Sequence, residues 1–126
     1  MNYDGVIIEE SLDNKDVLKI VKILKTKIEM VTPRMNTPHL KQWTLHTVEI
    51  PEEKADEIAQ EISRSLKLKE EWYADYRNNQ YHFIIFREKI FKVNRRSSFE
   101  YEKVKEYGIS LGIPAHQVNF TEDVVR

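Results

Sequence analysis

The stretch Tyr81-His82-Phe83-Ile84-Ile85-Phe86-Arg87 decides the fold, because it is apolar in both of its alternating sets of side chains. Successive side chains of a β-strand point to opposite faces of the sheet. A strand with one wet face alternates apolar and polar residues, and this stretch does not. The sequence therefore predicts a strand that is shielded from water on both faces.

Helices can cover one face of the sheet, and some other part of the protein, or a partner, has to cover the second. A contiguous aromatic surface rarely stays exposed on a monomer. Three covers are open: the N-terminal segment with the loop 32–41, a second copy of the chain, or a ligand. The strand around Trp43 has the same two-sided character, with Trp43 and Leu45 predicted on one side and Val48 and Ile50 on the other. We predict that the second face is the working surface.

Three strands are predicted around this stretch in an antiparallel meander. The strand 81–87 follows the strand 72–77 across Asn78-Asn79-Gln80, a suitable hairpin turn because asparagine tolerates positive φ. A turn at Glu88-Lys89 then leads into the strand 90–93.

The N-terminal half adds three more strands and two helical segments. Branched and aromatic residues predict strands at 6–8, 23–31 and 42–50, with a brief helix at 16–19 that gives way to strand near Ile20. Pro51 suits the first position of a longer helix. The apolar stripe of that helix is Ala55, Ile58, Ala59, Ile62 and Leu66.

A final helix is predicted from the capping box of Ser97 and Glu100 to about Leu111, where Gly112 and Pro114 stop it. The order is then β-α-β-β-α-β-β-β-α. It indicates one α+β domain over residues 1–126, with a mainly antiparallel sheet of five to six strands and the helices packed on one face. Residues 121–126 are expected to be a frayed tail.

Composition excludes several classes of function. The 126 residues carry a net charge of −1 and no cysteine, which rules out disulfides, thiolate zinc sites and cysteine nucleophiles. Only three glycines are present, too few for a glycine-rich phosphate loop. No run approaches the ~20 apolar residues of a membrane span, and no signal peptide is evident. We expect a cytoplasmic protein without a cofactor, whose partners are neither membranes nor nucleic acid.

Four stretches resemble a family of short bacterial and archaeal proteins of uncharacterised function. They are GVIIEES (residues 5–11), QWTLHTVEIP (42–51), WYAD (72–75) and YGISLGIP (107–114). The resemblance covers almost the whole chain. It implies no activity and assigns no role to any residue.

The second sheet face supplies the candidate binding site. Its candidate residues are Trp43, Leu45, His46, Tyr73, Asp75, Arg77, His82, Phe83 and Ile85. Tyr73, Asp75 and Arg77 alternate on one face of their strand and can present an acid, a phenol and a guanidinium to a polar ligand, or form a solvated face. We predict a non-enzymatic module that binds a partner protein, a small ligand or a second copy of itself.

Two alternatives remain open. Arg87, Lys89, Lys92, Arg95 and Arg96 form a basic segment that can hold phosphate, on a nucleotide or on a nucleic-acid backbone, or simply protect an edge strand. His46 and His82 would face each other if their strands pair, and could then serve as acid–base groups of a small enzyme with Asp75 or Glu49. The simpler interpretation is two packed histidines, and no metal-ligand spacing supports a metal site.

Overall fold

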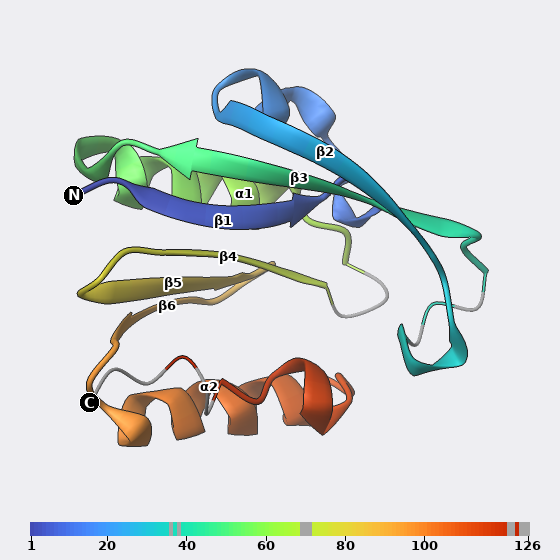
Figure 1. Ribbon diagram of the computed structural model, residues 1–126. Coiled ribbons are helices and arrows are strands. Elements are labelled where there is room, and N and C mark those ends of the chain that lie inside the picture. The colour runs from blue at the N-terminus through green and yellow to red at the C-terminus, as the bar shows by residue number, and fades with distance from the viewer. Residues whose placement is uncertain (36, 38, 69–71, 121–122, 124–126) are drawn as a thin grey trace.

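A computed structural model describes residues 1–35, 37, 39–68, 72–120 and 123, and shows one six-stranded sheet in which every neighbouring pair is antiparallel. The strand order is β2-β3-β1-β4-β5-β6 (Figure 1). The strands are β1 (Tyr3–Ile8), β2 (Lys22–Met30), β3 (Gln42–Ile50), β4 (Tyr73–Arg77), β5 (Tyr81–Phe86) and β6 (Ile90–Asn94). The helices are α1 (Ala55–Ser65) and α2 (Ser98–Ser110). The predicted α+β class and antiparallel sheet are confirmed.

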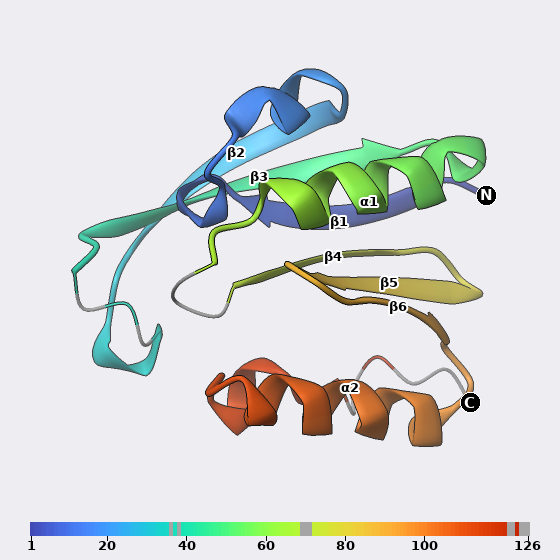
Figure 2. The ribbon, with the colours of Figure 1, turned by 180° about the vertical axis from the view of Figure 1, so that it is seen from behind.

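The two helices lie on opposite faces of the sheet, so the expectation that they share one face is wrong. Phe83 and Ile85 of β5 pack in a core with α1, whereas Ile84 and Phe86 pack in a second core with α2. Figure 2, from behind, shows α1 in front of the sheet and α2 beyond β6. We call the two sides the α1 face and the α2 face.

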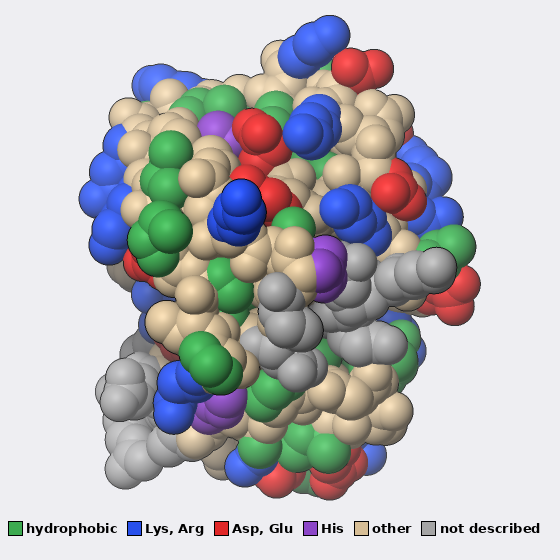
Figure 3. Space-filling model, turned by 90° about the vertical axis from the view of Figure 1, so that its right-hand side faces the viewer, with side chains coloured by type: hydrophobic (Ala, Val, Ile, Leu, Met, Phe, Trp, Pro, Cys, Tyr) green, Lys and Arg blue, Asp and Glu red, His purple; other side chains and the backbone are tan. Residues whose placement is uncertain are grey.

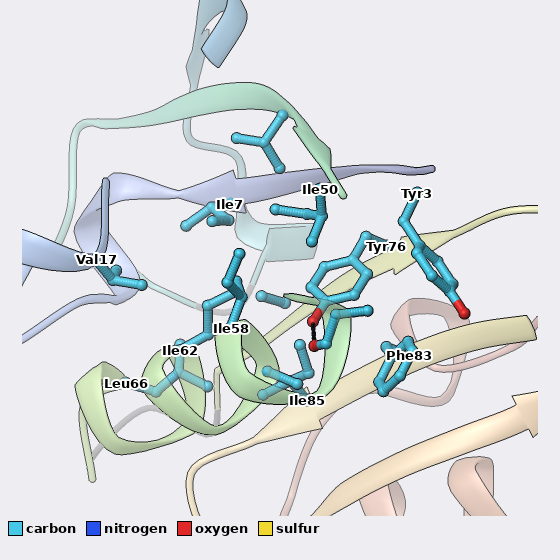
Figure 4. Close-up of a cluster of buried hydrophobic side chains, with 14 of the residues drawn as sticks. Tyr3, Ile7, Val17, Ile50, Ile58, Ile62, Leu66, Tyr76, Phe83 and Ile85 are labelled. Carbon is cyan, nitrogen blue, oxygen red and sulfur yellow. Dashed lines mark hydrogen bonds between the residues drawn. The ribbon is translucent and has the colours of Figure 1, made fainter. Parts of the chain in front are cut away.

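The α1 face holds the larger core (Figure 4). The predicted stripe of α1 is confirmed: Ala55, Ile58, Ala59, Ile62 and Leu66 are all buried. The ring of Tyr76 packs at 5.5 Å from Tyr3 and 5.1 Å from Phe83. Its hydroxyl donates a hydrogen bond to the carbonyl of Ala55, which ties β4 to the start of α1. Aromatic burial and one satisfied hydroxyl thus fix the helix on the sheet.

The α2 face is covered by α2 together with the segment 113–120 that follows it. Phe86 is 1% exposed, and its ring lies 5.7 Å from Tyr73 and 4.9 Å from Tyr107. Tyr101 and Val104 of α2 are buried in the same core. The strand 81–87 is thus shielded on both faces, as predicted, but the cover is the last helix and not the N-terminal segment, a ligand or a second copy.

A short connection explains why α2 reaches this face. Only residues 95–97 separate β6 from α2, and the hydroxyl of Ser97 accepts a hydrogen bond of 3.1 Å from the backbone N–H of Glu100. The carboxylate of Glu100 accepts from the N–H of Asn94 instead of completing the predicted capping box. The cap therefore fastens the helix start to the end of β6.

The β2 strand forms one edge of the sheet, and most of its side chains are exposed. A bulge between Ile23 and Lys25 interrupts its pairing with β3. Bulges and lysines are features that hinder edge-to-edge pairing with another chain.

The predicted frayed tail, residues 121–126, lies outside the described residues except for Asp123. Within the described part of the chain, neither helix combines the length and the apolar character that crossing a membrane requires.

Candidate functional site

A cavity of about 300 Å³ lies on the α2 face, between strands β1, β3 and β4 and the segment 113–117 that follows α2. Its floor is formed by β1 and β4, which pair so that Val6 lies opposite Asp75. Directly opposed residues of an antiparallel pair point to the same face, so both side chains enter the cavity side by side. The floor is therefore set by strand register.

Two segments far apart in the sequence form the walls. One is the β2–β3 connection around Arg34, and the other is the segment 113–117 after α2. The carbonyl of Arg34 accepts hydrogen bonds of 3.2 Å from Nε2 of His116 and from Nε2 of Gln117. The hydroxyl of Tyr73 donates to the carbonyl of Gln117. These bonds join the walls to each other and to the floor.

The lining is mostly apolar, with a few polar groups. It comprises Val6, Ile8, Thr32, Arg34, Met35, Thr37, Trp43, Trp72, Tyr73, Asp75, Ile113, Pro114, His116 and Gln117. The rings of Trp43 and Trp72 lie 5.2 Å apart, and Nε1 of Trp43 donates to the hydroxyl of Thr37 at 3.0 Å. Apolar walls with a few placed polar groups are typical of small-molecule sites.

Asp75 is the acidic residue of this lining, and its carboxylate is hydrogen-bonded to His82 on the side away from the cavity. Its Oδ2 lies 2.6 Å from Nε2 of His82, and Nδ1 of His82 lies 3.0 Å from the hydroxyl of Tyr101. His82 is fully buried, whereas the Asp75 side chain is 24% exposed. Burial raises the pKa of Tyr101 above its ordinary value of 10.0, so the phenol keeps its proton at neutral pH. The chain Tyr101–His82–Asp75 thus fixes the orientation of the carboxylate.

A second, more open hollow of about 510 Å³ adjoins the cavity, since Val6 and Asp75 line both. Two arginines line this hollow. Arg77 forms an ion pair of 2.9 Å with Asp123, and Arg95 donates to the main-chain carbonyls of Asp123 and Asn78. Both guanidinium groups are therefore engaged within the chain.

The structure divides the predicted binding residues into three groups. Trp43, Tyr73 and Asp75 meet in the cavity, and Arg77 lines the adjoining hollow. Leu45 lies on the same face, opposite Ile8, and His82 lies behind Asp75. The remaining predicted residues, His46, Phe83 and Ile85, lie on the α1 face and are buried there, so they take no part in the cavity.

His46 and His82 do not face each other, because the condition for it, pairing of their two strands, is not met. Strands β1 and β4 separate β3 from β5, and the two histidines point to opposite faces. His46 is 7% exposed and lies between Oε1 of Glu9 at 3.0 Å and Oγ1 of Thr26 at 2.8 Å. Both histidines are thus packed and hydrogen-bonded. The described residues also contain no group of three or more ligand-type side chains placed to hold a metal ion.

The contact between His46 and Glu9 makes a prediction for stability. The hydrogen bond from His46, helped by the charge of Lys15, lowers the pKa of Glu9 below its ordinary value of 4.5. A lowered pKa stabilises the fold above pH 4.5, and the contribution disappears as pH falls through the folded-state value. Glu9→Gln should therefore lower the free energy of unfolding by roughly 1 kcal/mol or less near pH 6, and by nothing near pH 2.

Urea unfolding at the two pH values measures this difference. Glu106→Gln, at an exposed position of α2, is the matched control, and its effect on the free energy of unfolding should not depend on pH. If Glu9→Gln lowered the free energy of unfolding by the same amount at both pH values, the stabilising role of the Glu9 carboxylate would be contradicted.

The basic segment does not converge on one place. Arg87 donates to the carbonyl of Leu66, and Arg95 donates to the carbonyls of Asn78 and Asp123. Lys92 lies over the ring of Tyr81 at 4.6 Å. On the side of the molecule in Figure 3, Lys and Arg side chains occupy separate places with Asp and Glu among them. These contacts favour structural roles over a phosphate site.

Comparison of the chain with models of known protein families, with curated proteins and with solved structures gave no match. The resemblance to uncharacterised bacterial and archaeal proteins therefore stays a prediction.

Sequence reasoning named three of the 14 residues that line the cavity, Trp43, Tyr73 and Asp75, and missed the other eleven. Arg34, Ile113 and His116 lie in segments predicted only as loops or helix stops. These residues show no helix or strand periodicity in the sequence. They reach the sheet only because the long β2–β3 connection and the chain reversal after α2 bring them there.

Proposed function

We propose that this chain is a small binding module that takes a small, partly apolar molecule into the cavity on the α2 face. The observation that carries the proposal is a hollow of about 300 Å³ with two tryptophans, a tyrosine and one anchored carboxylate. Its volume is at the lower end of the usual range for small-molecule sites. The ligand class that fits is a single ring or a short branched chain with one polar group.

The other predicted functions gain less support. The hypothesis of an enzyme that uses His46 or His82 gains no support, since both side chains are packed away from the cavity. Self-association stays a prediction, but α2 already supplies the cover for which a second copy was invoked.

Binding can be measured with the protein's own fluorescence, because both tryptophans of the chain line the cavity. Titration with the neutral probe 3-phenylpropionamide should change the tryptophan emission and shift the backbone amide resonances of Val6, Tyr73 and Asp75. A dissociation constant of about 1 mM or tighter is expected for so small a probe.

A variant that fills the cavity supplies the specificity test. Val6→Phe places a ring on the cavity floor and should weaken binding at least about tenfold, whereas Ile109→Phe on the exposed surface of α2 should leave it unchanged. Amide shifts confined to other surfaces of the wild-type protein, or binding unaffected by Val6→Phe, would overturn the proposal.

A further inference from the structure

We infer that the cavity selects a cation, a protonated amine joined to an aromatic or apolar group, and that Asp75 is the residue that binds its ammonium. This inference rests on the proposed function and specifies its ligand class. Three features of the described residues support it: the carboxylate of Asp75, the lack of a Lys or Arg beside it, and the aromatic rings of the lining.

The hydrogen-bond partners of His82 leave the Asp75 carboxylate as an acceptor. The Tyr101 hydroxyl can donate to Nδ1, which leaves the hydrogen on Nε2 to be donated to Oδ2 of Asp75. In this arrangement the imidazole is neutral and the carboxylate is the acceptor. The ring of His82 is fully buried against Tyr101 and Phe120, so its place behind Asp75 is fixed by packing.

The Asp75 carboxylate has no Lys or Arg partner in the part of the chain that the structure describes. Among the residues that the structure describes, no Lys or Arg nitrogen lies within 4.0 Å of Asp75. Arg77 and Arg95 line the hollow that adjoins the cavity, but they are engaged elsewhere. Arg77 pairs with Asp123, and Arg95 donates to main-chain carbonyls. A partly buried carboxylate therefore faces the cavity with only the His82 ring behind it. A cationic ligand would supply the missing counter-charge.

The other ionisable groups of the lining are the exposed residues Arg34 and His116 on the outer walls. Their charges are in contact with solvent and are screened more strongly than that of Asp75. Trp43 and Trp72, together with Tyr73 on the floor strand β4, add aromatic rings to the lining, and the faces of such rings attract cations. The cavity thus offers a cation both a carboxylate and π faces, and the rest of the ligand an apolar surface.

Three probes that share one ring and differ in charge test the inference: phenethylamine, 3-phenylpropionamide and 3-phenylpropionate. Phenethylamine should bind the wild-type protein about ten- to a hundredfold more tightly than the other two at neutral pH. Asp75→Asn keeps a carbonyl oxygen for His82 and removes the charge, so it should abolish this preference. Asp4→Asn, on the neighbouring strand and outside the cavity lining, should preserve it.

The outcomes separate this inference from the proposed function. Equal binding of the three probes, or a preference that survives Asp75→Asn, would overturn the cation inference and leave the cavity as a binding site. No binding of any probe would overturn both. If Asp75→Asn fails to fold, the ¹³C resonance of the Asp75 carboxyl in the wild-type protein decides: phenethylamine should shift it, and an unshifted resonance at saturation would contradict the inference.

Discussion

Replacing Phe86 by alanine is expected to lower the free energy of unfolding by about 3–5 kcal/mol, the usual cost of removing a buried aromatic ring. Phe86 is 1% exposed and touches rings from three parts of the chain: Tyr73 on β4, Phe91 on β6 and Tyr107 on α2. The loss should lower the melting temperature by roughly 10–20 °C. It should also loosen α2 from the sheet before the α1 core unfolds.

Phe99→Ala is the matched control, because Phe99 lies on α2 but is 70% exposed. Its ring contacts Lys103 at 5.1 Å, an exposed pair whose loss should cost less than about 1 kcal/mol. Urea unfolding measures both variants, and hydrogen exchange of α2 amides reports the loosening. Equal costs for the two substitutions would show that α2 is not the cover of this sheet face.

A substitution at Gly5 is the second change with a large expected effect. Gly5 lies in β1 opposite Tyr76, and a Cβ added there would lie 2.0 Å from the carbonyl oxygen of Asp75 and 2.5 Å from Cα of Tyr76. Both of these contacts are with backbone, so no change of side-chain rotamer relieves them. Gly5→Ala should therefore lower stability by about 3 kcal/mol or more, at or beyond the upper end of ordinary overpacking.

The same substitution should also impair the cavity, because relief of the clash requires β1 and β4 to move apart at Val6 and Asp75. Weaker binding of 3-phenylpropionamide to the folded fraction of Gly5→Ala is the expected result. Gly108→Ala is the comparison: its new methyl group would meet the Val118 side chain at 2.6 Å, and the gain in helix propensity of about 1 kcal/mol offsets part of the strain. A larger loss at Gly108 than at Gly5 would contradict this ranking.

The two-sided apolar strand shows how far a local pattern can lead. Its shielding on both faces followed from the alternation of side chains alone, and β5 is buried as that pattern required. The identity of the cover did not follow, because α2 has apolar residues on several sides and no clean stripe to show which face of the sheet it meets. With both helices expected on one face, the second face needed another cover, and α2 provides it.

The histidines illustrate a different limit. His46 and His82 were each placed correctly in strands, and their packed, hydrogen-bonded state was the simpler of two interpretations. Whether they meet depends on strand order, and hairpins do not specify it. Insertion of β1 between β3 and β4 moves the two histidines apart. This pairing joins distant parts of the chain, and the residues between those strands do not predict it.

The sequence by itself determined the class of the fold, most strand and helix positions, and the shared face of Tyr73, Asp75 and Arg77, because these depend on periodicity and on turn and cap residues that act over a few positions. Only the tertiary structure decided the strand order, the side on which α2 packs and the existence of the cavity. Those features arise where 32–37, β1, β4 and 113–117 come together, and contacts between distant segments are selected by the packing of the whole chain.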